Sequence, residues 1–102
     1  MRIYLSGPIT GTKDYLGRFS VAEKKLAKLG HSIINPAKVC AQLPEDTKYE
    51  QYMKVCIAML ETADAIYMME GWRESNGACK EYGMATFLGI HVLMEEGEFK
   101  WG

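Results

Sequence analysis

The sequence lacks the features that most directly identify metal-binding, membrane or nucleic-acid-binding proteins. Its 102 residues include only three cysteines, Cys40, Cys56 and Cys79, with no CxxC pair or Cys/His cluster, so no metal site is expected. No apolar run approaches the ~20 residues that span a bilayer, so no membrane partner is expected. The net charge of −1, with acidic and basic residues mixed along the chain, argues against nucleic-acid binding through a basic surface.

No targeting segment is expected at the start of the chain. Met1-Arg2-Ile3-Tyr4 leads directly into an expected strand, so no signal peptide is expected. An odd number of widely spaced cysteines is typical of free thiols, which are common in reducing compartments. Together these features predict a cytoplasmic protein.

The pattern of apolar residues predicts one α/β domain over residues 1–102. Strands are expected at residues 2–6, 31–34, 64–69 and 90–94. Helices are expected at about 14–29 and 49–62 and from Ser75 to about Leu88, with an irregular segment at 36–46. This alternation predicts a Rossmann-like or flavodoxin-like domain, whose four-stranded parallel sheet has the order 2-1-3-4 and helices on both faces. The first helix is expected to bury a stripe of Leu16, Phe19, Ala22, Leu26 and Leu29.

Ligands of such sheets bind beyond the carboxyl ends of the strands, where the winding direction reverses. With this strand order, the reversal lies between the first and third strands, next to loops 7–13 and 70–76. The first loop offers hydroxyls and backbone N–H groups, although its glycines are equally explained by the turn itself. Neither GxGxxG nor GxxxxGK[ST] is present, so no dinucleotide, triphosphate or other cofactor is expected.

Glu81 occupies an unusual position for a charged residue. It lies one helical turn from Ala78 and from Ala85, on the apolar stripe of the third expected long helix. A lone ionised carboxylate in a core costs several kcal/mol, so we expect the stripe to border a polar cleft. The alternative is that Glu81 lies at the edge of the stripe and reaches water. Ser75 and Gly77, just before it, form either an anion site at the helix N-terminus or an ordinary helix cap.

Three segments together resemble the nucleoside 2-deoxyribosyltransferase-like superfamily, which includes the 2'-deoxynucleoside 5'-phosphate N-hydrolases. They are IYLSGPITG at residues 3–11, ADAIY at residues 63–67, and Ser75-x-Gly77-x-x-x-Glu81-x-x-x-Ala85. In the third segment, Gly71-Trp72 precedes Ser75, and this form of the motif most resembles a small phage-associated branch of the superfamily.

This resemblance implies a nucleoside or nucleotide as ligand. It makes Glu81 the nucleophile at the anomeric carbon of a deoxyribose, with Tyr4 beside the reacting sugar and Ser75 against a 5' phosphate. It also implies a homo-oligomer with the site near a subunit interface, and Tyr49, Trp72, Phe99 and Trp101 are expected to stay partly exposed. The candidate binding residues are Gly7, Pro8, Ile9, Thr10, Gly11, Asp64, Trp72, Ser75 and Gly77. Among them, Trp72 is either a base-stacking residue or a subunit contact, and Asp64 either opens the third strand or also touches the cleft.

One position departs from the family pattern. The catalytic members carry an aspartate eight residues before the aspartate that opens the third strand, and here that position is Cys56. A thiol ionises near pH 8.5 and a carboxyl near 4, so Cys56 cannot replace an aspartate as a proton shuttle. Cys56 also lies on an apolar stripe, which favours a packed core thiol. The sequence therefore leaves open N-glycosidic cleavage or deoxyribosyl transfer, a non-catalytic nucleotide-binding protein that senses or sequesters its ligand, and a structural subunit.

Overall fold

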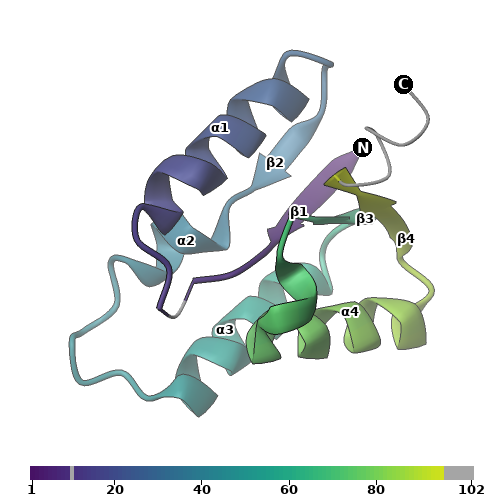
Figure 1. Cartoon of the computed structure of the whole chain (residues 1–102). Helices are drawn as coiled ribbons and strands as arrows, with labels where there is room; N and C mark the ends of the chain where they lie inside the picture. Colours follow the sequence, from purple (N-terminus) through teal and green to yellow (C-terminus); the bar gives the residue numbers. More distant parts are fainter. Residues whose placement is uncertain (10, 96–102) are drawn as a thin grey trace.

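The computed structural model describes residues 1–9 and 11–95 (Figure 1). Thr10, Phe99 and Trp101 lie outside these residues, so the expectations placed on them stay predictions. Within the described part, four strands form one parallel sheet in the order β2-β1-β3-β4: β1 Arg2–Ser6, β2 Ser32–Ile34, β3 Ala65–Met68 and β4 His91–Met94. The predicted fold class and strand order are confirmed.

The helices are α1 Tyr15–Ala27, α2 Pro36–Cys40, α3 Tyr49–Leu60 and α4 Asn76–Leu88, with a 3₁₀ turn, η1, at Trp72–Glu74. Figure 1 shows α1 on one side of the sheet and α3 and α4 on the other. No helix in the described ranges is long and apolar enough to cross a membrane.

The alternation of side chains along β1 divides the core into two layers. Ile3 and Leu5 pack with the α1 residues Phe19, Ala22 and Leu26. Tyr4 packs on the opposite face with residues of α3 and α4, among them Cys56 and Ala78. Successive side chains of a strand point to opposite faces, so Ser6 lies on the same face as Tyr4. The central strand therefore presents two hydroxyl groups towards α3 and α4.

Local sequence signals explain where α4 begins and ends. The Ser75 hydroxyl accepts a hydrogen bond from the Ala78 N–H at 3.2 Å, and Gly89 ends the helix with a φ of 74°. Both ends of α4 agree with the prediction from the sequence, whereas α2 lies where an irregular segment with at most one short turn was predicted. There the Asn35 side chain accepts from the Ala37 N–H at 3.1 Å, and Pro36 occupies the first helical position. Asn35-Pro36 is therefore the sequence signal that accounts for the start of α2.

The predicted buried stripe of α1 is partly wrong. Leu16 is 44% exposed, and Leu29 is 67% exposed because the helix ends two residues earlier, at Ala27. The helix instead turns Tyr15 inward, so the residues packed against the sheet follow the spacing Tyr15, Phe19, Ala22 and Leu26.

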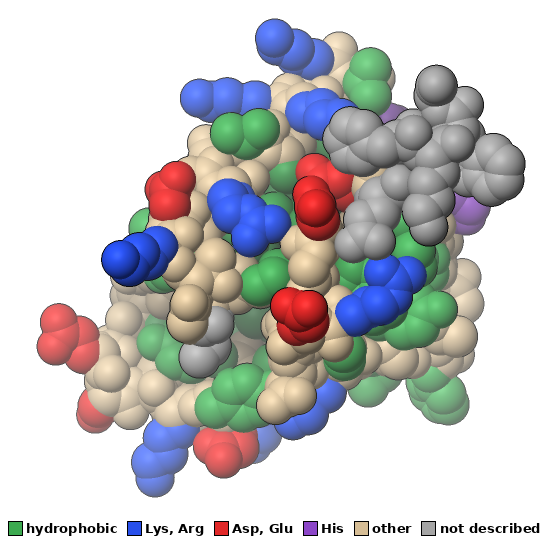
Figure 2. Space-filling view, viewed as in Figure 1, with side chains coloured by type: hydrophobic (Ala, Val, Ile, Leu, Met, Phe, Trp, Pro, Cys, Tyr) green, Lys and Arg blue, Asp and Glu red, His purple; other side chains and the backbone are tan. Residues whose placement is uncertain are grey.

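The surface carries no dominant sign of charge on the face shown in Figure 2. Acidic and basic side chains are interspersed there. This arrangement agrees with the near-neutral composition. That face therefore does not present the basic surface through which proteins bind nucleic acids.

Gly7 allows the segments that follow β1 and β3 to approach each other closely. The Met69 N–H donates to the Ser6 carbonyl at 2.8 Å, and this hydrogen bond holds the two segments together just beyond the ends of the strands. A Cβ atom at position 7 would lie 2.9 Å from the Cβ of Met69, closer than real side chains approach. Glycine is therefore required where the chain leaves β1 for the following loop.

We expect Gly7→Ala to lower the free energy of unfolding by about 1–3 kcal/mol, because the added methyl group must displace Met69. The matched control is Gly83→Ala, at a site in α4 where an added Cβ meets no atom within 4 Å. There the change should raise stability by about 0.5–1 kcal/mol. Urea unfolding of both variants checks this, and equal effects would refute the steric role of Gly7.

Candidate functional site

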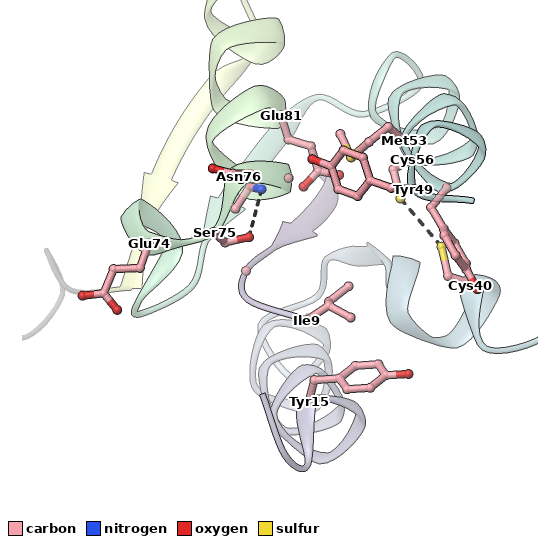
Figure 3. Close-up of a pocket in the computed structure, with 14 residues that line it drawn as sticks. Ile9, Tyr15, Cys40, Tyr49, Met53, Cys56, Glu74, Ser75, Asn76 and Glu81 are labelled. Atoms are coloured by element: carbon pink, nitrogen blue, oxygen red, sulfur yellow. Dashed lines mark hydrogen bonds between the residues drawn. The ribbon is translucent and has the colours of Figure 1, made fainter. Parts of the chain in front are cut away.

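A pocket of about 650 Å³ opens at the carboxyl ends of β1 and β3, between α3 and the N-terminus of α4 (Figure 3). Its lining comes from the loop after β1 and from α1, α2, α3, η1 and α4. The pocket thus lies where the strand order reverses, the position expected for the ligand site of such a sheet.

Glu81 lies at the inner wall of this pocket and is only 6% exposed. The Tyr4 hydroxyl donates a hydrogen bond to its Oε2 atom, and the Ser6 hydroxyl donates to its Oε1 atom at 2.7 Å. Both donors are buried and come from β1, two residues apart on one face of the strand. The two oxygens of the carboxylate are therefore held in one orientation by the central strand.

The surroundings of Glu81 act on its pKa in two directions. Burial raises the pKa of Glu81 above its ordinary value of 4.5, and hydrogen bonds from Tyr4, Ser6 and Cys56 offset part of this rise. Burial and the neighbouring carboxylate raise the pKa of Tyr4 well above 10, so the phenol keeps its proton. The site thus combines a basic carboxylate with two neutral donors.

Cys56 lies beside this group and lines the pocket from α3. Burial raises its pKa to about 12, so it is a neutral thiol near pH 7. Cys56 is buried in the apolar layer, as expected for a core thiol. It also borders the pocket, as expected for a residue at the position of the family's aspartate. Within the described residues, no group of three His, Cys, Asp or Glu side chains is arranged to hold a metal ion.

The N-terminus of α4 forms another wall through Ser75, Asn76 and Gly77. The first N–H groups of a helix have no partner within the helix, so a helix N-terminus in a pocket wall is a suitable place for an anion. A Cβ atom on Gly77 would lie 3.5 Å from Met53 Sδ and 3.8 Å from the Tyr49 hydroxyl. A larger residue at position 77 would therefore narrow the gap between α3 and α4.

The structure brings some of the predicted site residues together and separates others. Gly7, Ile9, Ser75, Gly77 and Glu81 line the pocket, and Tyr4 supports Glu81 from within the core. Pro8 and Gly11 do not belong to this lining.

Asp64 and Trp72 also lie outside the lining. Asp64 precedes β3 at the opposite end of the sheet, where its carboxylate accepts from the Arg2 N–H at 2.9 Å. The strand-start interpretation therefore fits Asp64, and its contact with the cleft is not found. Trp72 was expected to stay partly exposed, but it is 7% exposed because it stacks on Tyr82 in the apolar layer, with ring centroids 4.8 Å apart.

Other pocket residues were not predicted from the sequence. Ser6 was predicted only as the last residue of the first strand, although its hydroxyl bonds Glu81 directly. Three tyrosines, Tyr15, Tyr49 and Tyr52, supply aromatic walls, and Cys40, Met53, Glu74, Asn76 and Ala78 also line the pocket. Tyr49, Tyr52 and Cys56 follow helical spacing along one face of α3, and of these three only Cys56 was considered as a site residue from the sequence.

Comparisons with known proteins agree with this fold. The structure is similar to a 2-deoxyribosyltransferase from the psychrotolerant bacterium Bacillus psychrosaccharolyticus, with a TM-score of 0.74 and 24% identity over 92% of this chain and 71% of that one. It is also similar to a conserved protein from Enterococcus faecalis V583, with a TM-score of 0.69 and 18% identity over 92% of this chain and 62% of that one. At these identities, the likeness establishes a shared α/β fold.

The family is established by sequence. Residues 1–94 match the model of a family described as a domain of unknown function, DUF4406, and the chain belongs to this family. No curated protein matches the chain.

The raised pKa of Glu81 predicts how stability depends on pH. The folded state binds the carboxyl proton more tightly than the unfolded state, so wild-type stability falls as pH rises from about 4.5 through the raised value. Glu81→Gln does not titrate, and its amide can still bond the two hydroxyls. We expect this variant to become more stable than wild type as pH rises, with a difference that vanishes in acid, measured by urea unfolding between pH 4 and 8.

Glu23→Gln is the matched control, because the hydrogen bond from Asn35 lowers the pKa of Glu23. Its carboxylate contributes stability at pH values above its ordinary pKa and loses that contribution as pH falls, so the sign is opposite. If Glu81→Gln lost stability relative to wild type at pH 8, the burial account of Glu81 would be incorrect.

Proposed function

We propose that this chain binds a nucleoside or nucleotide and breaks or exchanges its N-glycosidic bond, with Glu81 as the nucleophile. The observation that carries this proposal is a buried glutamate that lines a pocket of about 650 Å³ while two buried hydroxyls fix both of its oxygens. The fold shared with a 2-deoxyribosyltransferase supports the same chemistry.

The chemistry follows from the charge that develops on the sugar. As the bond from the anomeric carbon to the base breaks, the sugar gains oxocarbenium character, which a close carboxylate stabilises or traps as an ester. The bonding electrons leave with the base, which must gain a proton. Water, or a second base, then releases the sugar from Glu81. The Tyr4 and Ser6 hydroxyls orient the carboxylate throughout.

The rest of the pocket offers matching contacts for such a ligand. Tyr15, Tyr49 and Tyr52 provide aromatic surface for a base. The N-terminus of α4 at Ser75–Gly77 provides N–H groups for a phosphate. These two features support a ligand with one aromatic end and one anionic end.

A second candidate function is non-catalytic nucleotide binding, for sensing or sequestering the ligand. Cys56 favours it, because a thiol with a pKa of about 12 does not shuttle protons near pH 7. Among the described pocket residues, the other carboxylate is Glu74, whose side chain points away from the pocket in Figure 3. Proton supply to the leaving base is therefore the weak point of the catalytic hypothesis.

Base release and binding should be measured together. With deoxynucleosides and their 5'-monophosphates, we expect wild type to bind in a thermal-shift assay and to release free base, detected by chromatography. Glu81→Gln should bind but lose base release by at least about 10²-fold, because the nucleophile is missing. Glu74→Gln is the control from the same pocket and should behave as wild type.

Cys56→Asp distinguishes the two candidate functions. If the thiol limits the reaction, the carboxyl should raise base release by about 10²–10⁴-fold. Binding without base release in either form would support the binding protein and refute the enzyme. Full turnover by Glu81→Gln would remove Glu81 from the reaction.

We also propose that the chain works as a homo-oligomer with the site near a subunit interface. Exposed apolar side chains on α3 and α4 support association, with Tyr49 41% and Phe87 84% exposed. Phe87→Lys should lower the mass measured by light scattering at micromolar concentration. Val21→Lys, on α1 across the sheet, is the control and should not change it. A monomeric wild type would refute this proposal.

The cytoplasmic location, the phage-associated branch and the relation to the N-hydrolases stay predictions from the sequence.

A further inference from the structure

Two of the three cysteines meet in the wall of the pocket. The Sγ atoms of Cys40, at the end of α2, and Cys56, on α3, lie 3.7 Å apart, and both residues line the pocket (Figure 3). Both are free thiols, with Cys40 half-buried and Cys56 buried. Cys79 lies apart on the exposed side of α4, where its thiol donates to the Arg73 carbonyl at 3.4 Å.

We propose that Cys40 and Cys56 form a redox modification site, which a small-molecule disulfide such as oxidised glutathione converts to an intrachain disulfide in the pocket wall. The sulfur atoms must approach by about 1.7 Å to reach a normal S–S bond length. Cys40 is the last residue of the five-residue helix α2, and residues 41–48 after it form turns rather than a helix. The backbone around Cys40 is therefore better able to adjust than that of Cys56, which lies within α3.

The reaction balances as two thiol–disulfide exchanges. Cys40, the more exposed thiol, loses its proton and attacks one sulfur of oxidised glutathione, which releases a first glutathione thiolate. Cys56 then loses its proton and attacks the Cys40 sulfur of the mixed disulfide, which releases the second glutathione. The protein loses two electrons and two protons, and one small disulfide becomes two thiols.

The environment of the pair sets the rate of this reaction. Burial raises the pKa of both thiols, to about 12 for Cys56, so thiolate is scarce near pH 7. Oxidation should therefore be slow at neutral pH and faster in alkali. The disulfide would also take the Cys56 thiol proton away from the surroundings of Glu81. The formation of the bond requires neither a ligand nor the chemistry of Glu81, so its failure and the failure of the proposed function are distinguishable.

The test uses the full chain and alkylation with mass spectrometry. The protein is incubated with oxidised glutathione at pH 7 and pH 9, quenched in acid, alkylated in denaturant and digested with trypsin. The three cysteines fall in separate peptides, residues 39–48, 55–73 and 74–80. We expect a cross-link between the first two peptides, with Cys79 still alkylated, and at least a tenfold faster reaction at pH 9. The cross-link should raise the melting temperature by about 10 °C.

Cys79→Ser is the control that should keep the cross-link, and Cys40→Ser and Cys56→Ser should lose it. Because wild type and Cys79→Ser carry the decisive result, poor folding of the other two variants would not affect it. Alkylation of all three thiols after oxidation would overturn the proposal. So would a glutathione adduct that stays on Cys40, or a cross-link that requires Cys79.

Discussion

The hydrogen bonds from Tyr4 and Ser6 to the Glu81 carboxylate are the interaction on which the rest of the site depends. They join the central strand to α4 across 75 or more residues of sequence. A buried carboxylate without partners would take up a proton or turn towards water. The two hydroxyl donors, which stay neutral, hold the oxygens in one orientation and offset part of the cost of burial. The pocket therefore has a fixed carboxylate at its inner wall rather than a mobile one at its mouth.

The same layer of the molecule serves both stability and the site. Tyr4 and Cys56 pack with Leu60, Ile66 and Ala85 in the apolar cluster under α3 and α4, and they also surround Glu81. The other face of the sheet, covered by α1, has an apolar core that includes Ile3 and Leu5. One face of the sheet is thus mainly an apolar core, while the other also accepts a buried carboxylate beside the cavity. This division follows from the alternation of side chains along β1.

Cys56 connects the two proposals made for this pocket. At this position the resemblance implies an aspartate, and the thiol found there pairs with Cys40 instead of supplying a carboxyl group. A neutral thiol next to Glu81 weakens general acid–base chemistry, whereas a dithiol makes the pocket wall open to oxidation. If both proposals hold, the oxidation state of this pair changes the surroundings of the carboxylate on which ligand chemistry depends.

The sequence by itself determined the strand order and the helix that begins after Ser75 and ends at Leu88, and it favoured an inward position for Glu81. The helix depends on local signals, namely its hydrophobic period, a serine cap and a terminal glycine, which act over a few residues. The strand order follows from the alternation of strands and helices, which restricts how parallel strands connect. Only the tertiary structure decided that Ser6 bonds Glu81, that Cys40 meets Cys56, and that Asp64 and Trp72 lie outside the pocket lining. It also decided that α1 turns Tyr15 rather than Leu16 inward. The reason is that such contacts depend on strand register and on the rotation of each helix against the sheet, which are set by packing between distant segments.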